Sequence, residues 1–179
     1  RKWPVVMFSP GYGGPRAFYT GLAEGLAAKG YVVVTLDHPY ESAVTELPDG
    51  RIAAAVDNFP ANASHAEGDV WMAKQLDIRA ADMRYALDQL RPEIIGADLA
   101  THLDLEHVGA IGHSLGGATA VVAMQRDARI RAAANVDGTP YGAMIGKPLD
   151  RPFLLLQSDY SETGHSDKFI LGNQSIIQH

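Results

Sequence analysis

The chain has 179 residues, no cysteine, a formal net charge of −6 and 46% hydrophobic residues. This length suffices for a substantial core, and we expect residues 1–179 to form one domain. The absence of cysteine excludes disulfides and zinc–thiolate sites. The acidic balance, with no basic cluster, argues against nucleic acid and an anionic membrane surface as partners, and no apolar run is long enough to span a bilayer.

The N-terminal half predicts short buried strands separated by a helix and a hairpin. Apolar runs such as PVVMFS and YVVVTL are typical of strands buried on both faces. Phe18, Leu22 and Leu26 recur with the spacing of a helix. In chain order, the predicted elements are a strand at 4–9, a helix ending at Gly30, a strand at 31–36, a hairpin at 44–54 and a polar loop at 57–68.

The C-terminal half continues the alternation of strands and helices. One apolar face runs from Met72 through Leu76 to Leu90, which predicts a long helix. The predicted elements that follow are a strand at 107–111, a helix at 117–124, strands at 131–136 and 152–157, and a helical tail at 166–179. The alternation predicts an α/β fold, with a mostly parallel sheet and helices on both of its faces.

The predicted sheet is small for a fold of this kind. A strand, a helix and two loops occupy about 25 residues, so a sheet of eight such units needs roughly 200 residues or more. The chain predicts five main strands and enters the first of them almost directly after Arg1. We therefore expect the centre of a larger fold that is truncated at both ends, without its first strands and without a last strand and helix.

The segment Gly112-His113-Ser114-Leu115-Gly116 is a G-x-S-x-G pentapeptide between a predicted strand and a predicted helix. A serine on such a sharp turn is lifted out of the sheet, so its hydroxyl is exposed to substrate. The flanking glycines permit a strained turn and a close passage of the helix past neighbouring strands. The pattern predicts that Ser114 is a nucleophile for acyl transfer through a covalent intermediate.

A serine nucleophile needs a histidine base and an acid that orients this base. In folds with such a turn, the acid and then the histidine follow the serine in the chain. Asp137 and Asp159 both follow predicted strands, at the edge where the active sites of open α/β sheets lie, and both are candidates for the acid. His165 is the candidate base, and the alternatives are His179 and a histidine beyond the chain.

Two backbone N–H groups are predicted to hold the developing oxyanion. One belongs to Leu115, the residue after the nucleophile. The other is assigned to Tyr12, in the glycine-rich loop after the first strand.

The glycines of this loop match a dinucleotide-binding fingerprint only in part, because Arg16 stands at the third glycine position. Four further histidines show no metal-ligand spacing, so we expect no metal site at His38, His65, His102 or His107.

Several segments together resemble the platelet-activating-factor acetylhydrolase family of α/β-hydrolases. They are residues 9–16 (SPGYGGPR), 30–34 (GYVVV), 37–43 (DHPYESA), 79–90 (RAADMRYALDQL) and 112–120 (GHSLGGATA). The Ser-Pro-Gly-Tyr segment is also similar to bacterial cutinases and polyester hydrolases. The acetylhydrolase pattern implies Asp137 as the acid, and the cutinase-like pattern implies Asp159. In both patterns the histidine follows a last strand, which this chain does not display.

The resemblance implies a serine carboxylic-ester hydrolase with an α/β-hydrolase fold. Its substrates would be small-molecule or lipid esters with short or oxidised acyl chains, and it would need neither a metal nor an organic cofactor. A cutinase- or polyester-hydrolase-like enzyme and an acyltransferase are the alternatives that keep the nucleophile. A non-catalytic fragment or pseudoenzyme that only binds a ligand or partner is the alternative from another class, motivated by the missing last strand and histidine.

Overall fold

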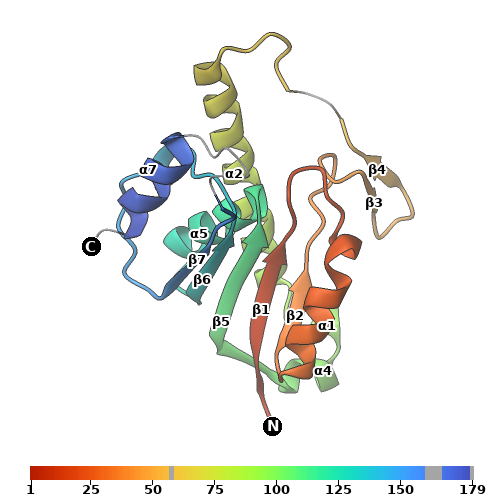
Figure 1. Ribbon diagram of the computed structural model, residues 1–179. Coiled ribbons are helices and arrows are strands. Elements are labelled where there is room, and N and C mark those ends of the chain that lie inside the picture. The colour runs from red at the N-terminus through yellow and green to blue at the C-terminus, as the bar shows by residue number, and fades with distance from the viewer. Residues whose placement is uncertain (57–58, 160–166, 178–179) are drawn as a thin grey trace.

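The computed structural model describes residues 1–56, 59–159 and 167–177 of the chain. Five parallel strands form its central sheet, in the spatial order β2-β1-β5-β6-β7 (Figure 1). These strands are β1 (Trp3–Ser9), β2 (Val32–Thr35), β5 (Leu103–His113), β6 (Ile130–Val136) and β7 (Phe153–Leu156). The expected parallel sheet of five main strands is confirmed.

Helices and a small hairpin connect the strands. The helical elements are η1 (Arg16–Tyr19), α1 (Thr20–Ala28), α2 (His65–Asp88), α3 (Pro92–Ile95), α4 (Ala97–Thr101), α5 (Leu115–Arg126), η2 (Gly142–Met144) and α7 (Asp167–Ile177). The predicted hairpin is formed by β3 (Val44–Glu46) and β4 (Ile52–Ala54), which pair antiparallel.

Most elements lie within two residues of their predicted bounds, and two boundaries differ by more. The polar loop ends before residue 65, because Ser64 and Glu67 form a capping box that starts α2. The Ser64 N–H donates to the Glu67 carboxylate at 2.8 Å, and the Glu67 N–H donates to Ser64 Oγ at 3.3 Å. The strand before the pentapeptide begins four residues earlier than predicted, because Leu103 and Asp104 pair with Trp3 and Pro4 before a register shift.

Helices lie on both faces of the sheet, as predicted. On one face α5 packs on β5 and β6, and α2 packs on α5 (Figure 1). The core on this side includes the buried side chains of Met7, Leu76, Met83, Val121 and Ile130. Leu76 and Met83 lie on the apolar face predicted for the long helix, and Met7 and Val121 lie in segments predicted as a buried strand and a packed helix.

The other face of the sheet is only partly covered. Here α1 packs against β2, and beside it an apolar hollow of about 370 Å³ is lined by residues of β1, β5, β6 and β7. Leu154 lies in this hollow with its side chain 53% exposed. In the described part of the chain, no helix combines the length and the apolar composition needed to cross a membrane.

Candidate active site

Ser114 occupies the sharp turn between β5 and α5. Its backbone has φ 53° and ψ −126°, which lies outside the main allowed regions for L-residues. Such a residue costs about 1–3 kcal/mol and persists only where its surroundings determine it. One determinant is the hydrogen bond from the Ser114 N–H to the Val136 carbonyl of β6, at 2.8 Å.

Close packing at the flanking glycines is a second determinant of this turn. A Cβ atom added at Gly116 would lie 2.0 Å from the Ser9 carbonyl oxygen, and one added at Gly112 would lie 2.2 Å from the Gly116 backbone. Any side chain at these positions would therefore push α5 away from β1 and β5. The prediction that these glycines permit a close approach of the helix to the strands is confirmed.

The loop after β1 lies against the nucleophile. A Cβ atom added at Gly11 would be 3.5 Å from Ser114 Cβ. Within the loop, the Gly14 N–H donates to the Gly11 carbonyl at 3.0 Å, and Gly13 has φ 71°. These contacts describe a tight turn whose backbone passes directly beside Ser114.

Three N–H groups of this loop donate to acceptors inside the protein. The Gly11 N–H donates to Tyr19 Oη at 3.2 Å, the Gly13 N–H donates to Glu41 Oε1 at 3.4 Å, and the Gly14 bond is the one given above. The Tyr12 ring packs edge-on against Trp71, with ring centroids 5.6 Å apart. The assignment of the Tyr12 N–H as an oxyanion donor stays a prediction.

Leu115 is the first residue of α5, directly after Ser114. The first N–H groups of a helix have no partner within that helix and point toward its N-terminal end. This position is compatible with the predicted role of the Leu115 N–H toward an oxyanion, which also stays a prediction.

Asp137 lies on the strand next to the nucleophile. His113 of β5 and Val136 of β6 are register partners, so Ser114 and Asp137 are the residues that follow them on adjacent strands. The Asp137 carboxylate accepts hydrogen bonds from the Ser158 N–H at 3.0 Å and from Ser158 Oγ at 2.9 Å. Asp137 itself has φ 59°, and its N–H donates to the Leu156 carbonyl at 2.7 Å.

Of the two other predicted site residues, Asp159 is described by the structure and His165 is not. Asp159 follows Ser158 beyond the end of β7, one strand farther from Ser114 than Asp137, and its side chain is exposed. His165 lies outside the described residues, so its role as base stays a prediction. The structure thus brings Ser114, Asp137 and the loop after β1 together at one edge of the sheet.

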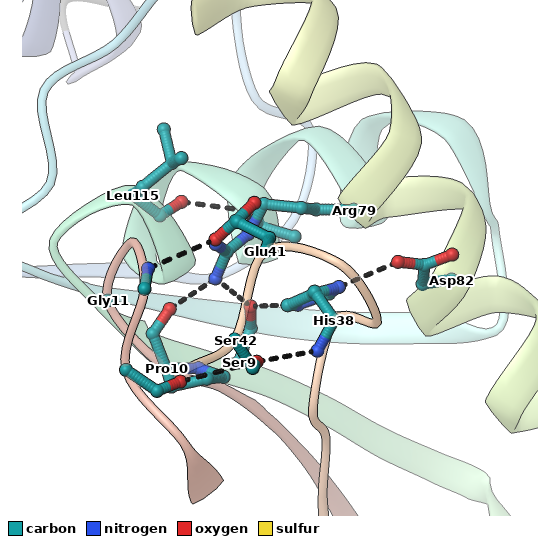
Figure 2. A network of polar contacts seen from close by, with 12 residues as sticks. Ser9, Pro10, Gly11, His38, Glu41, Ser42, Arg79, Asp82 and Leu115 are labelled. Atoms are coloured by element: carbon teal, nitrogen blue, oxygen red, sulfur yellow. Dashed lines mark hydrogen bonds and ion pairs between the residues drawn. The ribbon is translucent and has the colours of Figure 1, made fainter. Parts of the chain in front are cut away.

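A second serine, histidine and aspartate form a hydrogen-bonded series beneath this site (Figure 2). Ser9 Oγ lies 2.9 Å from His38 Nε2, and His38 Nδ1 lies 2.7 Å from Asp82 Oδ2. The Asp82 carboxylate accepts from Nδ1–H, so in the neutral ring Nε2 accepts from the Ser9 hydroxyl. Burial lowers the pKa of His38, which favours this neutral form.

This buried series has no access to a substrate. The exposed fractions of Ser9 and His38 are 0% and 2%. Ser9 Oγ also accepts a hydrogen bond from Arg79 Nη2 at 3.0 Å. Ser9 is therefore a hydrogen-bonding residue of the interior, whereas Ser114 is only half-buried and remains the predicted nucleophile.

Arg79 lies at the centre of the same network and is fully buried on α2. It forms an ion pair with Glu41 and donates to the Pro10 carbonyl. Burial raises the pKa of the Glu41 carboxyl, while the positive charge of Arg79 opposes this shift. Sequence reasoning gave Arg79 no role, although a cation on the apolar face formed by Leu76 and Met83 was a readable signal.

A larger hollow, of about 690 Å³, lies between the start of α2, the segment after Asp137 and α7. Phe59, Met72 and Tyr141 contribute apolar surface to it. Lys168 closes one side, with its Nζ 4.1 Å from the centre of the Tyr141 ring and an ion pair to Asp69. The hollow can therefore take a ligand with apolar and polar parts.

Comparisons with known proteins find ester hydrolases among the similar sequences and structures. The most similar relatives include a protein of Arthroderma benhamiae, "Probable 1-alkyl-2-acetylglycerophosphocholine esterase", which is 28% identical over 92% of this chain and 40% of its own length. Platelet-activating factor acetylhydrolase of Cavia porcellus is 26% identical over 94% of this chain and 43% of its own length. The chain thus spans about two fifths of the length of these relatives.

A solved structure, the ferulic acid esterase from Streptomyces cinnamoneus, matches with a TM-score of 0.81 and 31% sequence identity. The match covers 98% of this chain and 48% of that chain. The fold is therefore that of the α/β-hydrolases, as expected. Residues 1–170 also match the model of the family "Platelet-activating factor acetylhydrolase, isoform II". Since this match takes in both the Ser114 turn and the loop that faces it, the chain belongs to the platelet-activating factor acetylhydrolase isoform II family.

Proposed function

We propose that this chain carries the nucleophile of a serine carboxylic-ester hydrolase that acts through an acyl-enzyme. The observation that carries the proposal is the conformation of Ser114, held at φ 53° between β5 and α5 by glycine packing and by the bond to Val136. A fold maintains such backbone strain where it serves a site. The family match and the ester hydrolases among the similar proteins support the same reaction class.

In the proposed reaction, Ser114 Oγ attacks the ester carbonyl carbon while a histidine, predicted as His165, takes its proton. The N–H groups of Tyr12 and Leu115 stabilise the oxyanion of the tetrahedral intermediate. The histidine then gives the proton to the departing alcohol, which leaves an acyl-enzyme. Water, deprotonated by the same histidine, attacks this ester and releases the acid. Asp137 orients the histidine, a role supported by its place beside Ser114 on adjacent strands.

The proposed substrates are short-chain acyl esters or phospholipid-type esters. The name of the Arthroderma benhamiae relative supports an acetyl ester of a glycerophosphocholine, and the name of the Cavia porcellus relative supports removal of an acetyl group. The hollow with Phe59, Met72 and Tyr141 supports a ligand with an apolar part. The solved ferulic acid esterase, at 31% identity, favours small aromatic esters as the second candidate, and a cutinase-like preference for polyesters is tested beside it.

Fluorophosphonate labelling tests the nucleophile directly, because the probe reacts with an activated serine. We expect the chain to label, to lose the label in Ser114→Ala, and to keep it in the matched control Ser175→Ala. Ester turnover should fall by roughly 10⁴-fold or more in Ser114→Ala. A folded protein that neither labels nor hydrolyses any ester would instead support a non-catalytic, ligand-binding role.

A substrate panel separates the candidate preferences. The kcat/KM values for an acetylated alkylglycerophosphocholine, methyl ferulate and a short polyester are compared, with and without an added alcohol acceptor. A preference of at least tenfold for the phospholipid ester supports the first candidate. A feruloyl or polyester preference would replace it, and ester products formed with the alcohol would indicate an acyltransferase.

A further inference from the structure

One buried guanidinium group contacts the loop beside Ser114 from the interior of the protein. Arg79 Nη2 donates to the Pro10 carbonyl and, at 3.0 Å, to Ser9 Oγ (Figure 2). Its Nη1 pairs with Glu41, whose carboxylate accepts from the Gly13 N–H at 3.4 Å. Arg79 therefore holds the loop just before Gly11 and, through Glu41, also at Gly13, on both sides of Tyr12.

The same guanidinium is connected to the start of α5. Arg79 Nε donates to Thr119 Oγ1 at 3.2 Å, and the Thr119 hydroxyl donates to the Leu115 carbonyl at 2.8 Å. Tyr12 and Leu115 are the two residues assigned to the oxyanion site. One buried side chain on α2 thus joins the two backbone segments that this site requires.

We propose that Arg79 is the positioning residue of the oxyanion site, and that it sets the distance between the loop at Tyr12 and the N-terminus of α5. This inference rests on the proposed function. Oxyanion donors act only when they are held in place before the reaction begins. The loop also packs directly on the start of α5, since a Cβ atom added at Gly116 would lie 2.3 Å from the Pro10 carbonyl oxygen, and Arg79 adds directional hydrogen bonds to this contact.

Arginine suits this task better than lysine for a geometric reason. Its planar group presents five N–H donors in fixed directions and keeps its charge when buried. Arg79 uses this fork toward four acceptors on β1, the loop, residue 41 and α5. The Ser9–His38–Asp82 series adds to this order, because the Ser9 hydroxyl donates its hydrogen bond to His38 Nε2 and its oxygen remains an acceptor for Arg79.

The charges around the guanidinium are consistent with this role. Glu41 forms an ion pair with it, and the Asp82 carboxylate lies one histidine away. A buried cation without an anionic partner is strongly unfavourable, so Arg79 and Glu41 depend on each other. Removal of Arg79 or of Glu41 should loosen the loop. Replacement of the Arg79 guanidinium by a lysine ammonium should also loosen it, although the positive charge remains.

The test compares Arg79→Lys with Arg84→Lys in the full chain. Arg84 lies on the same helix, and its half-exposed side chain pairs with Asp127 at 3.5 Å, away from the loop. The measurements are kcat and KM for p-nitrophenyl acetate, and the rate of amide hydrogen exchange in residues 11–19. We expect Arg79→Lys to lower kcat by 10- to 1000-fold with KM within about threefold, since removal of one oxyanion donor costs about 10²–10³.

The exchange measurement separates positioning from a general loss of stability. In Arg79→Lys, exchange in residues 11–19 should rise at least tenfold while exchange in β5 stays as in the wild type. Arg84→Lys should change neither measurement. If Arg79→Lys fails to fold, Glu41→Gln replaces it, because this variant keeps an acceptor for the Gly13 N–H and should show the same changes at smaller size.

The possible outcomes distinguish this inference from the proposed function. A folded Arg79→Lys variant with unchanged loop exchange overturns the inference, whatever its kcat, and so does faster exchange with unchanged kcat. If the wild type hydrolyses no ester, the proposed function fails. In that case faster loop exchange in Arg79→Lys still supports the anchoring of the loop, and unchanged exchange overturns it.

Discussion

The glycines around Ser114 show how single residues determine the candidate site. Ser114 is held in a strained conformation, and its neighbours are residues without a Cβ atom because β1, β5 and α5 approach one another there. A methyl group at Gly116 would meet the Ser9 carbonyl oxygen, which belongs to the central sheet and cannot easily move. The packing of the turn is therefore a requirement for stability as well as for the proposed site.

We expect Gly116→Ala to destabilise the chain by about 3 kcal/mol or more, because overpacking against backbone leaves no room for relaxation. The control is Gly25→Ala in α1, where an added Cβ meets nothing within 4 Å. That substitution should stabilise the chain by about 0.5–1 kcal/mol through helix propensity. Urea unfolding of the two variants and the wild type measures both effects, and equal stability of Gly116→Ala and the wild type would contradict the packing.

The order of the strands distinguishes the positions of the two candidate acids. Asp137 and Asp159 each follow a strand in the sequence, so the local pattern is the same for both. In the sheet, β6 is the neighbour of β5, and β7 is one strand farther away. The carboxylate of Asp137 is also oriented by Ser158, from the end of β7. Strand order thus favours Asp137 as the acid of the proposed triad.

Asparagine substitutions test this choice. Asp137→Asn should lower kcat by about 10⁴-fold, the size of the effect when a triad aspartate becomes asparagine and the histidine tautomer is wrong. Asp159→Asn is the matched control and should stay within about threefold of the wild type. Steady-state kinetics with p-nitrophenyl acetate measures both, and a larger loss in Asp159→Asn would assign the acid to that residue instead.

Elements that depend on interactions between residues close in sequence were predictable, and those that depend on distant residues were not. The strands, the hairpin and the Ser114 turn depend on nearby residues, so apolar periods and turn residues indicated them correctly. The start of α2 was misjudged although its capping box is local, because Ser64 and Glu67 were taken as part of a polar loop. The buried group of Ser9, His38, Arg79 and Asp82 comes from three separated segments, and no local pattern unites them.

For the molecule as a whole, this buried network makes the free energy of unfolding depend on the protonation of His38. His38 is enclosed between β1 and α2, with Asp82, Asp37 and Arg79 as the charged groups that affect it. Burial, the largest cause, lowers the pKa of His38 below its ordinary value of 6.5. The unfolded chain therefore binds a proton at His38 at a higher pH than the folded chain does.

The resulting stability contribution is fully present above pH 6.5 and is lost as the pH falls from there through the folded pKa. We expect the free energy of unfolding to decrease between pH 7.5 and pH 5, by up to about 1.4 kcal/mol per pH unit for this one proton. His38→Gln should flatten the dependence, and the exposed control His107→Gln should keep it. Urea unfolding across this pH range measures the effect, and an equal slope in His38→Gln would contradict it.

The α/β alternation, the candidate nucleophile and the glycines around it can be read from the sequence, because they follow from short-range periodicity and backbone sterics. The packing of the folded chain is needed to see that Asp137 follows the strand next to Ser114, that Ser9 is enclosed and that Arg79 joins the loop at Tyr12 to α5. Those facts depend on which strands become neighbours and which side chains lose contact with water. Strand neighbours and side-chain burial are established when distant segments pack together, so the residues adjacent in sequence do not predict them.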